Sequence, residues 1–292
     1  MLRAERSSQK HPEKEGKGAL YLCGTPLGNL EDITLRALRV LGMVDLIAAE
    51  DTRCTRKLLS RYDIHTPLTS FHEHNQEEKI PFLLSELAKG KLVALVTDAG
   101  MPGLADPGYH LVRRALIEGY GVTVVPGPSA VVAALVISGF PPYPFYFQGF
   151  LPRARGARRE LLKELEEETR TGVFYETPHR LQKTLEDFRE VWGEERRAAV
   201  ARELTKQHEE VVRGTFAELA AHFAAHPPRG ELTLVTEGRR REAPAPPEDP
   251  EALRAAVEAL RRAGAEFQAA CKAVARALGI SKSEVYRACR GK

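Results

Sequence analysis

Four short segments rich in glycine, proline and charged residues are the part of this sequence best suited to chemistry. They are GTPLGNLED (24–32), EDTR (50–53), DAGMPGLADPG (98–108) and PGPSA (126–130). Glycine allows a close approach of the backbone and positive φ, whereas proline fixes the path of the chain. Loops of this kind expose N–H and C=O groups that can bind a flat polar ligand such as adenosine or a methionine tail. For any one loop, a tight turn without a ligand is the alternative.

Each of these segments follows an apolar stretch with the length of a strand. Strands are predicted at 19–24, 44–50, 67–71, 92–98 and 122–127, and helices at 32–42, 55–62, 77–90, 109–121 and 129–139. Regular alternation of strand and helix predicts a parallel sheet covered on both faces. Ligands bind at the carboxyl ends of the strands in such sheets, so we expect the four segments to form one rim.

The pattern changes after residue 144, where strands and helices no longer alternate strictly. Strands are predicted at 145–150, 172–177, 197–203, 209–215 and 231–237, and the main helix begins at Pro178. The expected domain organisation is a disordered tail (1–18), a first α/β domain with a parallel sheet (19–140), a second α/β domain with a mixed sheet (145–238), a proline-rich linker (239–250) and a helical unit (251–292). The helical unit carries a helix-turn-helix pattern around Gly279.

Composition narrows the class of protein. The chain has 292 residues, 43% of them hydrophobic, which is enough for about two cores, and a formal net charge of +3. No apolar run is long enough to span a membrane, and the first residues lack the apolar core of a signal peptide. The four cysteines are widely spaced, which indicates a reducing cytoplasm and no zinc site. His72 and His74 lack further ligands at metal spacing, so no metal is expected.

Two common nucleotide-binding motifs are absent. GTPLGNL is not followed by Lys-Ser/Thr, as a Walker A loop would be, and DAGMPG does not match G-x-G-x-x-G. The sequence therefore gives little support to a nucleoside triphosphate or a dinucleotide as the ligand.

The ordered set GTPLGNLEDIT, AAEDTRCT, FHEHN, VTDAGMPGLADPG, PGPSA, FQGFLPR, FYETPHR, ARELTK and ELTLVTEG carries a resemblance. Over residues 19–238 it resembles the tetrapyrrole methylase superfamily. Within that superfamily it is most similar to the methyltransferases that modify the ribose 2′-hydroxyl of a decoding-centre cytidine in small-subunit (16S) ribosomal RNA. The resemblance implies two α/β domains, an S-adenosylmethionine site in the cleft between them, and a homodimer.

The resemblance also implies where the cofactor binds. The residues that it assigns to the S-adenosylmethionine site are Pro26, Asp98, Ala99, Gly100, Met101, Ser129, Ala130, Tyr175, Leu204 and Leu234. The last three are aligned by motif order and would enclose the adenosine from the second domain. A helix that begins at residue 129 or 130 would present an N-terminus that favours a carboxylate.

A ribose hydroxyl is a weak acid, so its methylation needs a base or a cation near the oxygen. We expect Lys206 and Arg53 to contact RNA phosphate or the developing alkoxide, and Glu50 or Asp51 to orient the ribose. A surface ion pair or a helix cap is the alternative for each of them, and Asp51 has the position of an N-cap. No residue is identified as the general base.

Basic segments indicate an RNA partner. Four arginines lie within seven residues, at Arg153, Arg155, Arg158 and Arg159, and Arg180 follows in YETPHR. Guanidinium groups bind phosphate and stack on bases. The basic helical unit at 251–292 suits RNA binding or docking to the small ribosomal subunit, and packing on the dimer is an equal alternative.

Two other functions stay open at this stage. A methylase of the same superfamily could act on a small molecule such as a precorrin-like macrocycle, although such a site needs neither the arginine segment nor the basic helical unit. A non-enzymatic RNA-binding regulator could instead use the helix-turn-helix and sense the cofactor with its α/β body. Methyl transfer to small subunits, free RNA and precorrin separates the three.

Overall fold

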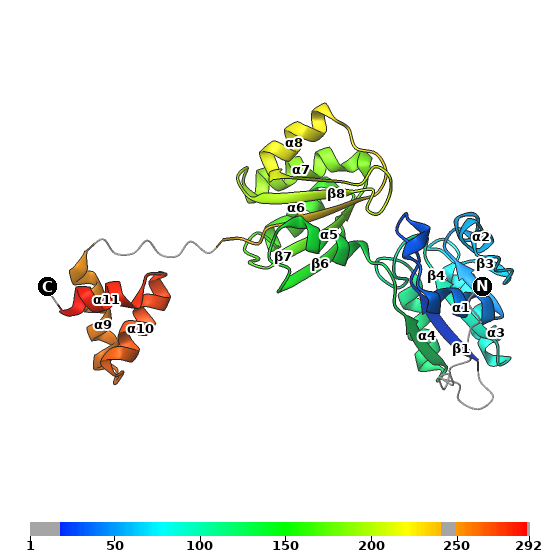
Figure 1. Cartoon of the computed structure of the whole chain (residues 1–292), viewed down its shortest axis with the longest axis horizontal. Coiled ribbons are helices and arrows are strands. Elements are labelled where there is room, and N and C mark those ends of the chain that lie inside the picture. Colours follow the sequence, from blue (N-terminus) through cyan, green and yellow to red (C-terminus); the bar gives the residue numbers. More distant parts are fainter. Residues whose placement is uncertain (1–17, 241–248, 291–292) are drawn as a thin grey trace. The chain divides into compact units, whose positions relative to one another are not determined.

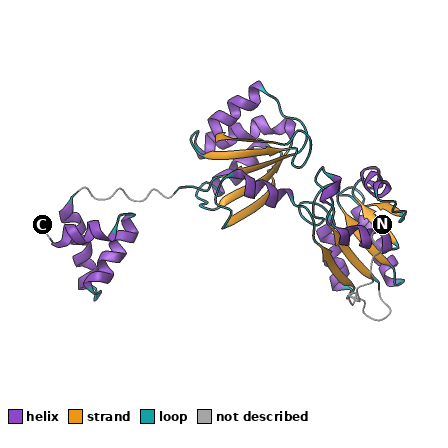
Figure 2. Ribbon diagram, viewed as in Figure 1, coloured by secondary structure: helices purple, strands orange, loops and turns teal. Residues whose placement is uncertain are grey.

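The computed structural model describes residues 18–240 and 249–290 (Figure 1). Contacts within the chain divide it into two compact units, Met1–Gly238 and Arg239–Lys292. The tail predicted before residue 18 and most of the predicted linker, residues 241–248, lie outside the described residues. The first unit contains two separate β-sheets, whereas the described part of the second unit is helical (Figure 2).

The first sheet is parallel throughout, with the strand order β3-β2-β4-β1-β5. Its elements in chain order are β1 (Ala19–Cys23), the short 3-10 helix η1 (Leu30–Asp32), α1 (Leu35–Met43), β2 (Leu46–Ala49), α2 (Thr52–Arg61), β3 (Leu68–Ser70), α3 (Gln76–Ala88), β4 (Leu92–Val96), α4 (Gly108–Ile117) and β5 (Gly121–Val125). The five strands predicted from the apolar stretches are all confirmed. Parallel connections bring the carboxyl ends of these strands to one edge.

Both faces of the first sheet are buried, which explains why its strands are apolar at consecutive positions. On one face, Tyr21 and Ile47 pack with residues of α1 and α2. On the other face, Leu20 and Ala48 pack with residues of α3 and α4. Successive side chains of a strand point to opposite faces, so burial on both sides requires an almost unbroken apolar run.

The second sheet is mixed, with the strand order β6-β7-β10-β8-β9. Its elements are β6 (Phe145–Phe150), α6 (Arg155–Glu164), β7 (Thr171–Glu176), α7 (Pro178–Trp192), β8 (Arg197–Arg202), β9 (Glu210–Thr215), α8 (Phe216–Ala225) and β10 (Leu232–Thr236). Only the β6–β7 pair is parallel, and the other three pairs are antiparallel. This arrangement confirms the mixed sheet predicted from the sequence.

Helix α5 (Ala130–Ser138) follows the first sheet in the chain but packs against the second sheet. Its buried residues Val131, Ala134 and Leu135 share a cluster with Val173 of β7 and Val235 of β10. The opposite face of the sheet is covered by α6, α7 and α8. The helix that the sequence assigns to the end of the first domain thus completes the core of the second sheet.

The second unit is a three-helix cluster of α9 (Pro250–Arg262), α10 (Phe267–Leu278) and α11 (Lys282–Arg290). Helix α10 ends at Gly279, which has φ of 66°, and Ser281 and Glu284 exchange hydrogen bonds at the start of α11. This reciprocal capping marks the start of α11, within the segment for which the sequence predicts a helix-turn-helix. Within residues 18–240 and 249–290, no helix combines the length and apolar composition needed to cross a membrane.

Candidate active site

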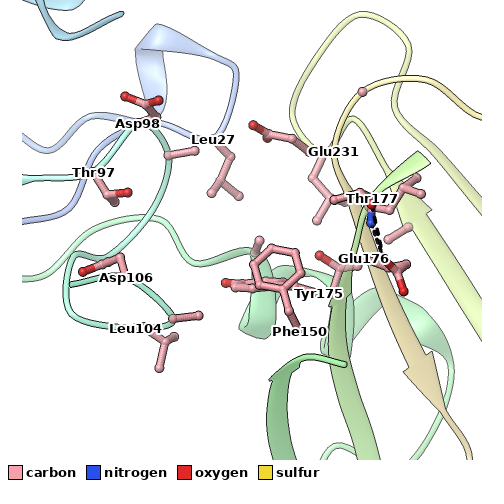
Figure 3. Close-up of a pocket in the computed structure, with 18 of the residues that line it drawn as sticks. Leu27, Thr97, Asp98, Leu104, Asp106, Phe150, Tyr175, Glu176, Thr177 and Glu231 are labelled. Carbon is pink, nitrogen blue, oxygen red and sulfur yellow. Dashed lines mark hydrogen bonds between the residues drawn. The ribbon is translucent and has the colours of Figure 1, made fainter. Parts of the chain in front are cut away.

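A cavity of about 320 Å³ lies between the loops of the first sheet and one end of the second sheet (Figure 3). Its wall on the side of the first sheet and α5 is made by Leu27, Glu50, Thr97, Asp98, Ala99, Met101, Leu104, Ala105, Asp106 and Ala130. Its other wall is made by Phe150, Tyr175, Glu176, Thr177, Pro178, Ala201, Leu204, Gly230, Glu231, Leu232 and Thr233. Loops that follow β1, β2 and β4 contribute, as expected for the carboxyl edge of a parallel sheet, and Ala130 is the first residue of α5, which follows β5.

Hydrogen bonds hold the loop after β4 in a fixed path. Thr25 and Gly100 form an isolated antiparallel bridge, in which each N–H donates to the other residue's carbonyl oxygen at 2.9 and 3.1 Å. Gly100 has φ of 84°, a conformation that suits glycine. Further along, the Asp106 carboxylate accepts from the N–H groups of Gly103 and Gly108, at 2.7 Å each. The loop therefore presents an ordered backbone to the cavity.

Close packing between the loops after β1 and β5 explains the glycines at positions 24 and 127. A Cβ atom on Gly24 would lie only 2.7 Å from the Cα of Gly127, so side chains are excluded where the loops after β1 and β5 meet. These glycines let the loops approach each other, a structural role that the sequence pattern alone does not distinguish from ligand contact.

On the side of the second sheet, the cavity is lined by a row of side chains from three neighbouring strands. Thr233 of β10 is paired directly with Tyr175 of β7 and with Ala201 of β8. Paired residues share a face of the sheet, so all three line the cavity. The ring of Phe150 lies 5.4 Å from that of Tyr175 (Figure 3). This wall therefore offers two aromatic rings to a bound molecule.

The cavity is acidic. Glu50, Asp98, Asp106, Glu176 and Glu231 line it, and no lysine, arginine or histidine does so among the described residues. Partial loss of hydration and the neighbouring carboxylates of Glu50 and Glu231 raise the pKa of Asp98. Burial also raises the pKa of Asp106. Glu50 is held in place because its carboxylate accepts from the Thr97 hydroxyl and from the Asp98 N–H.

A lysine stands at the edge of this acidic site. Lys206 Nζ lies 2.9 Å from Glu203 Oε1 and 3.4 Å from Glu231 Oε2. Partial burial alone would lower the pKa of Lys206, but these carboxylates raise it above its usual value. Glu203 and Thr205 have φ of 51° and 66°, and non-glycine residues in this region are strained. Backbone strain of this kind is concentrated at functional sites.

Six of the ten residues predicted to bind the cofactor line the cavity, namely Asp98, Ala99, Met101, Ala130, Tyr175 and Leu204. Pro26, Gly100, Ser129 and Leu234 do not line it. Pro26 is buried, and its neighbour Leu27 lines the cavity. The backbone of Gly100 is hydrogen-bonded to Thr25. Ser129 is the N-cap residue of α5, one position before Ala130.

Leu234 lies on the face of the second sheet that points away from the cavity. It pairs with Phe174 and Val200 and is buried in the cluster under α6, α7 and α8, on the face away from the cavity. Its neighbour Thr233 occupies the cavity face instead. A shift of one residue reverses the face of a strand, so an assignment by motif order alone could not distinguish the two.

Of the predicted catalytic residues, only Glu50 lines the cavity. Asp51 is the N-cap of α2, where its side chain accepts from the Arg53 N–H. The Arg53 guanidinium also pairs with the Asp51 carboxylate at 2.7 Å, and this contact lowers the pKa of Asp51. The capping alternative considered for Asp51 is thus what the structure contains.

The arginine segment divides into paired and unpaired side chains. Arg158 is 4% exposed, and its Nε donates to the buried Asp187 at 2.8 Å. Arg155 also bonds Asp187, and Arg155 and Arg159 both pair with Glu190. Burial of Arg158 does not fit the phosphate contact predicted for it, because its charge is already neutralised inside the fold.

Among the described residues, the Arg153 side chain is unpaired, whereas Arg180 is held by several hydrogen bonds. Arg153 is exposed and has no ion-pair partner in the described part of the chain. The Arg180 guanidinium donates to the carbonyl oxygens of Leu151 and Pro152, at 2.8 and 3.1 Å, and lies 3.5 Å from Glu176. Arg180 therefore fastens the segment after β6 to α7 and is only partly available to a ligand.

Sequence reasoning missed several residues of the cavity. Asp106 belongs to the glycine-rich segment 98–108, Thr97 lies near the end of the strand predicted at 92–98, and Glu231 is the first residue of the strand predicted at 231–237. Their polar side chains at a strand end were a usable signal. Phe150 had no such signal, because an aromatic residue at the end of an apolar strand equally fits a core. No group of three potential metal ligands occurs among residues 18–240 and 249–290.

Comparison with known proteins places this geometry in a family. The model of the family "Tetrapyrrole (Corrin/Porphyrin) Methylases" matches residues 19–220. A Thermotoga maritima protein named "Ribosomal RNA small subunit methyltransferase I" is 51% identical over 222 residues, covering 76% of this chain and 99% of the relative. An Escherichia coli O157:H7 protein with the same name is 43% identical over 281 residues, covering 96% of this chain and 97% of the relative.

Solved structures agree on the fold. Cobalt precorrin-4 methyltransferase is similar with a TM-score of 0.58 and 20% sequence identity, covering 75% of this chain and 94% of that one. Uroporphyrin III C-methyl transferase from Thermus thermophilus is similar with a TM-score of 0.56 and 20% identity, covering 75% and 97%. The two sheets, the cavity at the strand ends and the sequence matches lead to one conclusion: the chain belongs to the tetrapyrrole methylase family and, within it, to the ribosomal RNA small subunit methyltransferase I group.

Proposed function

We propose that this protein methylates the 2′-hydroxyl of a cytidine in the decoding centre of small-subunit (16S) ribosomal RNA, using S-adenosylmethionine. The observation that carries the proposal is the identity of 43–51% to relatives named for small-subunit ribosomal RNA methylation. The ribose position and the identity of the base rest on the resemblance of the sequence motifs. The fold alone does not separate this substrate from a macrocycle, because its structural neighbours include precorrin and uroporphyrin enzymes.

The residues of the cavity fit S-adenosylmethionine. The volume lies in the range of small-molecule sites, and the walls combine apolar side chains with carboxylates. A lining with five acidic and no basic side chains among the described residues suits a ligand that carries a positive sulfonium and ribose hydroxyls, and it disfavours a phosphate-bearing dinucleotide. Residues 98–101 would hold the methionine end, and Tyr175 and Leu204 would enclose the adenosine. Pro26, Gly100, Ser129 and Leu234 would support these positions from outside the cavity.

S-adenosylmethionine supplies a methyl group on a sulfonium that a nucleophile can attack. The protein's own task is to position the ribose oxygen and to stabilise the negative charge that develops on it. Lys206 is the cation placed for this, because Glu203 and Glu231 hold its ammonium at the edge of the cavity. Glu50, fixed by Thr97, would orient a ribose hydroxyl. Asp51 and Arg53 would act beside it at the start of α2.

Transfer of a tritiated methyl group to three acceptors tests the proposal. The acceptors are assembled small ribosomal subunits, free ribosomal RNA and a precorrin. Label on a ribose of the small subunit or its RNA supports the function, and label confined to the macrocycle contradicts it.

We propose the small ribosomal subunit as the partner and the cytoplasm as the location, since ribosomal subunits are found there. The exposed Arg153, with Arg155, Arg159 and Arg180 in part, would contact its RNA; the buried Arg158 would instead support that segment. In the second unit, residues 267–290 carry five exposed basic side chains and one acidic side chain, Glu284. The basic residues are Lys272, Arg276, Lys282, Arg287 and Arg290. Almost the whole T. maritima relative aligns with three quarters of this chain. An accessory role in docking therefore fits this unit.

We also propose a homodimer. Strand β5 is an edge of the first sheet, and Val124 on it is 51% exposed. On α5, one turn apart, Val132 and Val136 are 53% and 63% exposed. Edge strands and apolar faces of this kind are usually covered by a partner. Sedimentation equilibrium tests the proposal: a monomer at micromolar concentration would contradict it.

A further inference from the structure

A second hollow of about 1150 Å³ adjoins the cavity and shares Ala105, Phe150 and Thr177 with it. The rest of its lining comes from the segment after β6, from α6, from α7 and from the loop after β3. These residues are Glu73, Leu151, Pro152, Arg153, Arg155, Arg158, His179, Arg180, Lys183 and Glu186. We call this hollow the basic groove. Because it adjoins the cavity, a chain lying in it could place one of its units inside the cavity.

Three cationic or ionisable side chains in the basic groove are available to a ligand. Arg153, His179 and Lys183 are exposed, and within residues 18–240 and 249–290 none of them has a carboxylate partner. His179 has a single weak contact, between its Nε2 and the Thr177 hydroxyl at 3.4 Å. His179 and Lys183 are one turn apart on α7 and so lie on the same face.

The other three arginines in the basic groove already have partners within the protein, and two carboxylates also line the groove. Arg155 and Arg158 bond Asp187, and Arg180 is held by backbone carbonyl oxygens and Glu176. Two carboxylates, Glu73 and Glu186, also line the groove. Spaced cations with intervening carboxylates suit a chain whose phosphates recur at intervals, because each cation can contact a separate phosphate.

Phe150 stands where the two hollows meet. It is the last residue of β6, it is 50% exposed, and its ring is tilted by 53° against the neighbouring ring of Tyr175 (Figure 3). A half-exposed aromatic ring between a basic groove and a ligand cavity is the arrangement with which proteins stack unpaired bases.

We propose that the basic groove holds single-stranded RNA, with phosphates on Arg153, His179 and Lys183 and an unstacked base on Phe150 at the entrance to the cavity. This inference rests on the proposed function and adds the path of the substrate. To reach the cavity, the target ribose must leave a helical stack, and an aromatic platform compensates for the stacking that is lost.

The contribution of Lys183 can be measured through the salt dependence of RNA binding. The probe is a short, fluorescein-labelled, single-stranded fragment of small-subunit ribosomal RNA, bound by the full-length protein in fluorescence anisotropy. Each phosphate contact to a single strand contributes about 0.7 to the slope of log affinity against log salt. We expect Lys183→Ala to bind severalfold more weakly and to reduce the slope by about 0.7. The matched control is Lys163→Ala, an exposed lysine of α6 outside both hollows, which should bind like the wild type.

Phe150→Ala tests the stacking platform, and Phe150→Trp is its rescue. We expect the alanine variant to lose about 5- to 100-fold in RNA affinity and the tryptophan variant to bind within about threefold of wild type. Calorimetric titration with S-adenosylhomocysteine shows whether either variant retains its cofactor cavity. If Phe150→Ala fails to fold, Phe150→Leu keeps the bulk of the side chain and removes the stacking.

The outcomes separate this inference from the proposed function. If the wild type methylates small-subunit RNA but Lys183→Ala and the Phe150 variants bind the probe like the wild type, the groove assignment is wrong and the function stands. If the wild type methylates only the macrocycle, the proposed function fails first. Loss of the salt slope in Lys183→Ala together with rescue in Phe150→Trp supports the inference.

Discussion

Replacing Arg158 with alanine is expected to destabilise the protein, because the side chain belongs to a buried ion pair. Arg158 Nε lies 2.8 Å from Asp187 Oδ2. Arg158 Nη1 donates to the carbonyl oxygens of Pro152 and Arg153 at 3.2 and 3.3 Å. Removing one partner of a buried pair costs about 3–5 kcal/mol, since the other charge is left without compensation. Arg155 stays 2.9 Å from Asp187, so we expect the lower end, about 3 kcal/mol.

Differential scanning calorimetry measures this loss directly. For a unit of this size, 1 kcal/mol corresponds to about 2–4 °C, so the melting temperature should fall by roughly 6–12 °C. Arg153→Ala is the matched control, since Arg153 is exposed, and its unfolding free energy should stay within about 0.5 kcal/mol of wild type. A melting temperature of Arg158→Ala equal to that of Arg153→Ala would show that the buried ion pair does not stabilise the fold.

Substitutions at three further positions address the cavity and its edge. Lys206→Ala should lower kcat by about 10²–10³-fold with little change in cofactor affinity, while Lys206→Arg retains most activity; equal rates for all three proteins would count against an electrostatic role. Gly100→Ala should lower stability by roughly 1–3 kcal/mol and weaken cofactor binding, because its φ of 84° strains an alanine; unchanged calorimetry would argue otherwise. Arg53→Ala should return the lowered pKa of Asp51 toward about 3.9 in an NMR titration. Since the folded-state pKa of Asp51 is the lower one, its stabilising contribution is present above the unfolded-state pKa and is lost as pH falls. An unchanged Asp51 pKa would show that Arg53 is not the cause.

The sheets and the location of the cavity could be predicted because they depend on local patterns. Apolar runs bounded by glycine and proline mark β1, β2, β4 and β5, and a parallel sheet brings their carboxyl ends together whatever the details of packing. The polar segments after those strands therefore had to meet at one edge, and the cavity lies there.

Side-chain roles that depend on a neighbour distant in sequence could not be predicted. The partner of Arg158 is Asp187, 29 residues further along the chain, and nothing in the arginine segment itself indicates that one of its members is buried. The position of α5 is a similar case, because its uniformly apolar sequence does not say which of two sheets it covers. The assignment of Leu234 instead of Thr233 failed by one residue, which is enough to reverse the face of a strand.

A crystal structure with S-adenosylhomocysteine would show directly whether the cavity binds the cofactor. We expect the ligand to occupy the cavity, with its amino-acid end against the backbone of residues 98–101 and its adenosine between Tyr175 and Leu204. Electron density for the ligand at any other place, or a cavity closed by its own side chains in the complex, would rule out this cavity as the cofactor site.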